Sequence, residues 1–190
     1  MSWNQYPRPM LQRDSYYSLN GTWDFAAREE KYTQTIEVPA CVEDRGQTLW
    51  YRKHFTCPKD FQKSRVLLHF GAVDQIAKVY LNGQPVGEHE GGYLPFTLDV
   101  TAALQGENVL TVEVQDHLHN KILPYGKQKY KRGGMWYTPV SGIWQTVWME
   151  SVPETYIRDI QIKNGLDWVE ISVKGITRGT VEIEGMAPVA

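Results

Sequence analysis

The residues of this sequence best suited to hold a ligand follow one another in a single irregular stretch. Asp116 can accept two hydroxyl hydrogen bonds, and Gln128 can both donate and accept. Trp136 and Tyr137 offer flat ring faces against which the C–H face of a sugar can stack. Hydroxyl recognition combined with ring stacking is what a sugar site requires. We therefore predict a ligand site formed by Asp116, Gln128, Trp136 and Tyr137.

The stretch that carries these residues is itself an indication of function. Residues 116–142 lack strand periodicity, contain clustered lysines such as Lys127, and include Gly133-Gly134, where a backbone can be approached closely. Long loops inside compact domains are uncommon and are often functional. Two other interpretations stay open, namely a surface loop that packs its own aromatic rings and a contact with another domain.

No catalytic residue is predicted. Glycoside hydrolysis needs two carboxylates about 5 Å apart for retention, or further apart for inversion. Glu88 and Glu90 lie on the same side of an extended segment, but this spacing is common by chance. The sequence contains no G-x-S-x-G elbow and no P-loop. Glu88, Glu90 and Tyr93 remain worth testing for contact with a ligand or a neighbouring domain.

No metal site and no cofactor are predicted either. His117 and His119 would face the same way on an extended segment, but only the adjacent Asp116 is available as a third ligand. His54 and His69 lie within strand-like runs, where a histidine that is hydrogen-bonded inside a sheet is the simpler interpretation.

The overall composition excludes several classes of protein. The chain has 190 residues and a formal net charge of −2, which predicts no nucleic-acid partner and no membrane surface. No apolar run approaches the ~20 residues of a membrane helix. Residues 1–10 lack a signal-peptide pattern, so we expect a cytoplasmic protein. Cys41 and Cys57 lack the close spacing of a zinc site; thiols are expected, and a disulfide stays open.

The elements that must position the loop are strands. Val66, Leu68 and Phe70 share one face of an alternating run, and residues 109–115 alternate in the same way. Asn82-Gly83 is typical of a two-residue hairpin turn. No convincing segment has helical periodicity. About eight strands separated by turn signals predict an all-β jelly-roll β-sandwich.

The ends of the chain differ from this central part. Residues 1–18 are polar and irregular, which indicates an arm lying over the domain. Val152-Pro153 marks a boundary, so we expect a jelly-roll sugar-binding domain over residues 1–152. Residues 153–190 then read as the truncated start of an immunoglobulin-like β-sandwich, because three alternating runs follow, at residues 156–163, 167–174 and 180–184.

Six segments together resemble the N-terminal sugar-binding domain of glycoside hydrolase family 2, which includes β-galactosidases, β-glucuronidases and β-mannosidases. They occur in that family's order and cover residues 19–150. The segments are LNGTWDF at 19–25, VP at 38–39, WYRKHF at 50–55, LHFGAVDQIAKVYLNGQPVGEHEGGYLPFTLDVT at 68–101, NVLTVEVQD at 108–116 and SGIWQTVWME at 141–150.

The resemblance implies a galactose-binding-like jelly roll, an immunoglobulin-like sandwich and then a catalytic TIM barrel. The barrel needs about 250 residues, and it holds both catalytic glutamates, one directly after an asparagine. This sequence contains no Asn-Glu dipeptide. We therefore expect a non-catalytic region of a retaining β-glycosidase, inactive by itself, that contacts a β-glycoside or monosaccharide and the missing barrel.

The resemblance also leaves alternatives. In some β-galactosidases of the family an acidic residue of this domain reaches the active site, and Gly134 stands at about that position here. Asp116 is the candidate in this sequence for the role of that acidic residue. An autonomous carbohydrate-binding module, or a purely structural domain docked on the barrel, would fit the same sequence, and so would a homo-oligomer.

Overall fold

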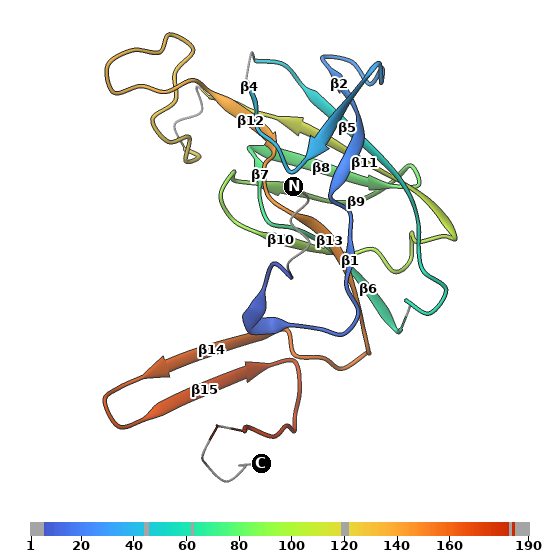
Figure 1. Ribbon diagram of the computed structural model, residues 1–190, viewed down its shortest axis with the longest axis vertical. Helices are drawn as coiled ribbons and strands as arrows, with labels where there is room; N and C mark the ends of the chain where they lie inside the picture. The colour runs from blue at the N-terminus through green and yellow to red at the C-terminus, as the bar shows by residue number, and fades with distance from the viewer. Residues whose placement is uncertain (1–5, 44–45, 62, 119–121, 183, 185–190) are drawn as a thin grey trace.

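The structure is a computed structural model that describes residues 6–43, 46–61, 63–118, 122–182 and 184 (Figure 1). In this part of the chain it consists of β-strands and one 3₁₀ turn, η1 (Pro9–Leu11). No helix of the described residues is long and apolar enough to cross a membrane. The predicted all-β class is confirmed.

Two antiparallel sheets form the sandwich. The larger sheet has the strand order β3-β2-β5-β11-β8-β9. Its strands are β2 (Gly21–Ala27), β3 (Gln34–Val38), β5 (Leu49–Thr56), β8 (Ile76–Leu81), β9 (Gln84–Glu90) and β11 (Glu107–Gln115). The smaller sheet has the order β1-β13-β6-β10, with β1 (Tyr17–Ser18), β6 (Arg65–Phe70), β10 (Phe96–Asp99) and β13 (Val147–Val152).

Two smaller sheets complete the fold. Three short strands, β4 (Val42–Glu43), β12 (Val140–Ile143) and β7 (Val73–Asp74), close one end of the sandwich. The strands β14 (Asp159–Asn164) and β15 (Val169–Lys174) form a separate hairpin that extends from the opposite end (Figure 1).

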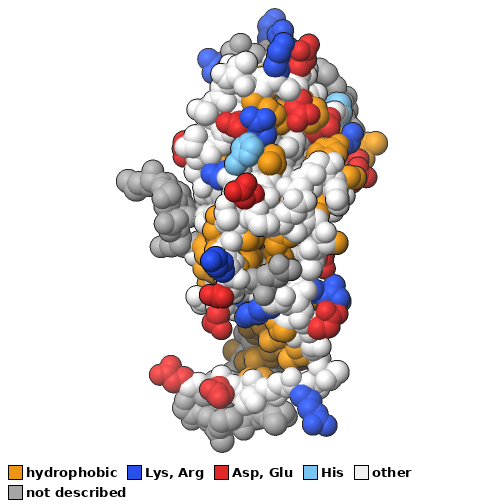
Figure 2. All heavy atoms as spheres, turned by 90° about the vertical axis from the view of Figure 1, so that its right-hand side faces the viewer, with side chains coloured by type: hydrophobic (Ala, Val, Ile, Leu, Met, Phe, Trp, Pro, Cys, Tyr) orange, Lys and Arg blue, Asp and Glu red, His pale blue; other side chains and the backbone are white. Residues whose placement is uncertain are grey.

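Alternation along the strands builds the core. Val66, Leu68 and Phe70 of β6 are fully buried and face the buried side of β11, where Leu110 and Val112 lie. β11 buries every second side chain, whereas β6 and β13 are buried on both faces. The inner faces of the two sheets interdigitate into one apolar core. Figure 2 shows acidic and basic side chains interspersed on the outer surface that it views, as the small net charge implies.

The turn between β8 and β9 forms as its sequence predicts. Asn82 and Gly83 both have positive φ, 54° and 77°, which a two-residue turn of this hand requires. The Asn82 side chain also accepts a hydrogen bond from the Val109 backbone at 2.9 Å and donates one to the Ala103 carbonyl at 2.8 Å. The turn is therefore fixed to the neighbouring strand as well as by its own backbone.

The N-terminal arm crosses the outer face of the smaller sheet and ends in the short strand β1, which the sequence did not predict. It covers Glu150 of β13 completely. The Glu150 carboxylate accepts hydrogen bonds from Arg8 Nη2 at 2.9 Å, from Arg13 Nε at 2.8 Å and from the Tyr6 hydroxyl. The Nε2 atom of His69 lies 3.1 Å from the same carboxylate.

The C-terminal runs and the two cysteines compare with their predictions as follows. The runs at 156–163 and 167–174 correspond to β14 and β15. In the run predicted at 180–184, the only pairing among residues 180–182 is an isolated bridge at Val181, and residue 183 lies outside the described residues. Cys41 and Cys57 are both free thiols; Cys41 is exposed and Cys57 is half-buried.

Candidate functional site

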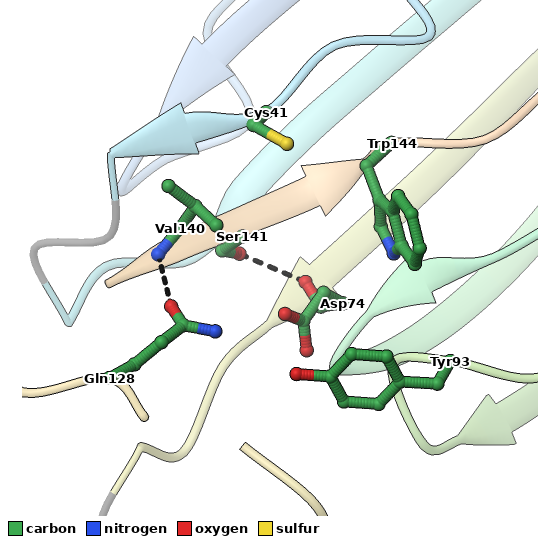
Figure 3. Close-up of a pocket in the computed structure, with 7 residues that line it drawn as sticks. All are labelled: Cys41, Asp74, Tyr93, Gln128, Val140, Ser141 and Trp144. Carbon is green, nitrogen blue, oxygen red and sulfur yellow. Dashed lines mark hydrogen bonds between the residues drawn. The ribbon is translucent and has the colours of Figure 1, made fainter. Parts of the chain in front are cut away.

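A cavity of about 150 Å³ lies where the three short strands meet the end of the sandwich (Figure 3). This volume is below the roughly 300–1,000 Å³ of a pocket that encloses a drug-sized ligand, so the cavity has room for only part of such a ligand. It is lined by side chains from five separate segments of the chain: Cys41, Asp74, Tyr93, Gln128, Val140, Ser141 and Trp144.

The short sheet holds the first group of these residues in register. Asp74 in β7 pairs with Gly142 in β12, and Ser141 pairs with Val42 in β4. The Ser141 hydroxyl donates a hydrogen bond to the Asp74 carbonyl at 2.9 Å. Because Ser141 and Asp74 are both almost fully buried, this bond fixes the polar floor of the cavity.

The aromatic wall depends on a close approach at Gly92. The Trp144 indole donates from Nε1 to the Gly92 carbonyl at 2.8 Å, and the Tyr93 ring meets the Trp144 ring edge-on at 6.2 Å. A Cβ at position 92 would overlap the Asp74 carboxylate. Glycine is therefore needed here to let the Tyr93 turn close over β7.

Burial and nearby charges affect the protonation of two side chains that line the cavity, Tyr93 and Cys41. Burial raises the pKa of Tyr93, and the negative charges of Asp74 and Asp116 raise it further, so its hydroxyl stays protonated at neutral pH. Cys41 is exposed as a residue, but partial burial of its thiol and the Asp74 charge likewise raise the thiol pKa. Figure 3 shows the Tyr93 hydroxyl and the Asp74 carboxylate facing the same space.

Of the four predicted ligand residues only Gln128 lines the cavity, although a backbone bridge places Tyr137 beside Gln128. Gln128 lines the cavity, where its Oε1 accepts a hydrogen bond from the Val140 backbone at 2.5 Å. Asp116 is nearly buried just after β11, and its charge acts on Tyr93. Trp136 and Tyr137 are not among the lining residues.

The other residues considered from sequence lie apart from the cavity, with one exception. Tyr93 belongs to its wall, whereas Glu88 and Glu90 are exposed on the edge strand β9. His119 lies outside the described residues. Among the described residues no three His, Cys, Asp or Glu side chains come together in a way that could hold a metal ion.

The sequence reasoning missed Asp74, Ser141 and Trp144. Asp74 and Ser141 stand in strands whose apolar neighbours indicate only core packing. The one available signal was the Gly91-Gly92 pair before Tyr93, because a glycine pair permits backbone to approach a side chain closely. With an acid, a hydroxyl, an amide and two ring edges, the cavity can bind a hydroxylated ligand.

The fold and sequence match one family over most of the chain. Residues 23–179 match the family described as glycosyl hydrolase 2 galactose-binding domain-like. The chain belongs to this family, which confirms the resemblance expected from its sequence and the galactose-binding-like sandwich that the structure contains.

Individual relatives are glycoside hydrolases. A β-galactosidase of Thermoanaerobacter pseudethanolicus is 37% identical over 62% of this chain and 16% of its own length. A β-glucuronidase of Formosa agariphila is 33% identical over 74% of this chain and 17% of its own length. The solved β-glucuronidase of an uncultured Clostridium sp. has a TM-score of 0.71 and 28% identity, over 86% of this chain and 34% of that one.

This chain therefore spans a sixth to a third of the length of these relatives. It corresponds to their galactose-binding-like region and not to a whole hydrolase.

Proposed function

We propose that this chain is the non-catalytic sugar-binding region of a retaining β-glycosidase, and that the cavity around Asp74 forms one wall of the sugar site. The observation that carries the proposal is the buried Asp74 carboxylate facing the Tyr93 hydroxyl beside the Trp144 indole. A carboxylate and a phenol can bind sugar hydroxyls, and ring edges exclude water from the C–H surface.

The names of the relatives support a β-glycoside as the class of substrate. Those relatives are called β-galactosidase and β-glucuronidase, so we infer a β-glycoside for the protein to which this chain belongs. Retention requires two carboxylates about 5 Å apart, in a covalent mechanism. We assign that pair to a catalytic domain beyond this chain.

The first experiment measures activity and binding of the purified chain. We expect no hydrolysis of nitrophenyl β-glycosides, and weak calorimetric heat with one of galactose, glucuronic acid or mannose. Asp74→Asn should abolish that heat, while Asp60→Asn, an exposed acid away from the cavity, should leave it unchanged. Clear turnover by the chain alone would contradict the proposal, and so would sugar binding that survives Asp74→Asn.

A second candidate function is docking of the catalytic domain. Large apolar side chains are exposed around the cavity end of the sandwich, including Leu94, Ile122, Met135 and Tyr137. Such patches mark interaction surfaces. If docking is the only role, Leu94→Ser in the full-length enzyme should lower its melting temperature without changing its preference among sugars.

A further inference from the structure

The loop that carries Gln128 is an ordered ribbon. The Tyr137 backbone nitrogen donates to the Lys127 carbonyl at 2.6 Å, and the Lys129 nitrogen donates to the Tyr137 carbonyl at 3.1 Å. Gly133 and Trp136 exchange backbone hydrogen bonds of 3.4 and 3.2 Å and close the turn. The segment is therefore held by its own backbone as it projects from the cavity end of the sandwich (Figure 1).

This ribbon has two chemically different faces. Gln128 points into the cavity (Figure 3). Lys127 and Lys129, on either side of Gln128 in the sequence, are both exposed, and the outer face of the ribbon is defined here by these two residues. Exposed Lys131 and Arg132 follow in the turn.

The positive charges of this face are positioned by neutral groups. Lys129 Nζ lies 4.0 Å from the ring centroid of Trp136, and Arg132 Nη1 donates to the Thr138 hydroxyl at 3.1 Å. The ion pairs found among the described residues involve other lysines and arginines. The sequence also contains no Asp or Glu between Asp116 and Glu150. Lys129 and Arg132 are thus oriented by neutral groups, and none of the four cations forms an ion pair with another described residue.

We propose that the outer face of this loop, formed by Lys127, Lys129, Lys131, Arg132 and Trp136, is a binding surface for an anionic glycan. The recognised groups are carboxylates or sulfate esters on sugar units beyond the one that occupies the cavity. The proposal rests on the proposed function, because the cavity on the other face of the same ribbon is what makes the ligand a carbohydrate.

Charge and shape favour a glycan over other polyanions. The chain as a whole carries a formal net charge of −2, so the positive potential is confined to one short loop and gives no footprint for nucleic acid. Trp136 is half-buried and Tyr137 is exposed beside the cations, and such rings can pack against the C–H faces of sugar units.

The test is affinity electrophoresis of the whole chain in gels that contain one polymer each. Polygalacturonate carries carboxylates, dextran sulfate carries sulfate esters, and dextran is neutral. We expect retardation by at least one acidic glycan and none by dextran. The double variant K127E/K129E should bind that glycan about tenfold more weakly, a change of one decade in Kd. The matched control K31E/K59E changes two exposed lysines outside the loop and should bind as the wild type does.

Comparing the polymers shows which anionic group, the carboxylate or the sulfate ester, the loop binds. Retardation by polygalacturonate alone assigns carboxylated glycans, and retardation by dextran sulfate alone assigns sulfated ones; retardation by both assigns anionic glycans in general. Equal retardation by polyglutamate would overturn the glycan assignment in favour of an acidic protein surface. Unchanged binding by K127E/K129E, or a loss that the control shares, would overturn the proposal.

A failure here can be told apart from a failure of the proposed function. Asp74→Asn changes the cavity and should leave retardation by the acidic polymer intact. If monosaccharide binding depends on Asp74 while K127E/K129E has no effect on the polymers, the outer surface is wrong and the cavity stands. The opposite pattern would retain the outer surface and reject the cavity.

Discussion

At the scale of single residues, Gly92 is the position where one methyl group has the largest consequence for the cavity. Gly92→Ala would drive a Cβ into the Asp74 carboxylate, and overpacking of this kind costs about 1–3 kcal/mol. We expect that loss of unfolding free energy in urea denaturation, together with loss of sugar binding. Gly106→Ala is the matched control, since a Cβ there meets nothing within 4 Å. Equal stability of the two variants would contradict the packing argument.

Glu150 is the residue whose charge matters most to stability. Its side chain is fully buried, and Arg8 and Arg13 point their cationic groups at it. Removing one partner of a buried ion pair leaves the others uncompensated, so Glu150→Gln should cost about 3 kcal/mol in urea denaturation. Glu154→Gln, which breaks an exposed pair with Arg65, should produce no measurable change.

The same residue predicts how stability depends on pH. Burial raises the pKa of Glu150, but hydrogen bonds from His69 and Tyr6 and the charges of His69 and Arg8 outweigh this and hold its pKa well below the usual range. Burial lowers the pKa of His69, partly opposed by Glu150, while Arg8 and Arg13 lower it further. Both groups therefore bind fewer protons in the folded state than in the unfolded one.

The free energy of unfolding should accordingly decrease in two stages as the pH is lowered. The His69 contribution is lost below its ordinary pKa of 6.5, and the Glu150 contribution is lost below 4.5. Urea midpoints measured across this range test the sign. In Glu150→Gln the second stage should be reduced; a wild-type midpoint that rises on acidification would contradict the assignment.

At the scale of elements, the N-terminal arm joins the sandwich to the hairpin. Arg13 donates from Nε to Glu150 at 2.8 Å and from Nη2 to the Ile157 carbonyl at 2.8 Å, and its guanidinium lies 5.3 Å from the Tyr156 ring centroid. A planar guanidinium can make these contacts together, whereas a lysine ammonium cannot. One side chain thus connects three segments.

This connection predicts the local stability of the junction. Arg13→Ala should open the segment around Arg158, so that trypsin cleaves there about tenfold faster, because local opening limits cleavage. Arg13→Lys should not restore protection. Lys59→Ala, an exposed position without such contacts, is the control. Cleavage at the wild-type rate in Arg13→Ala would mean that the arm does not hold the junction.

At the scale of the whole molecule, the β14–β15 hairpin presents an apolar face that nothing in the described chain covers fully. Its cross-strand pairs Ile160–Val173 and Ile162–Ile171 share that face, and Ile162 and Val169 are more than half exposed. Exposed apolar area of this kind favours association.

We therefore expect the purified chain to self-associate through this hairpin at high concentration. Val169→Thr combined with Val173→Thr should shift sedimentation towards the monomer without changing unfolding of the sandwich. Ser172→Thr, on the opposite face of β15, is the control. Association that the double variant leaves unchanged would place the contact elsewhere.

Much of this architecture can be predicted from the sequence because strands carry local signals. Alternation placed Val66, Leu68 and Phe70 on one face, and Asn82-Gly83 turned the chain, both without knowledge of distant partners. The order of six short segments identified the family. These signals are local along the chain, so a single sequence contains them in full.

Only the tertiary structure could show which residues form the cavity. Asp74, Tyr93, Gln128 and Trp144 are far apart in the chain and converge because β4, β12 and β7 pair across the end of the sandwich. Within the loop, the backbone pairing at Tyr137 turns Gln128 towards the cavity and leaves Trp136 beneath Lys129. Periodicity reveals which side chains share a face of one strand, but long-range pairing determines what that face meets.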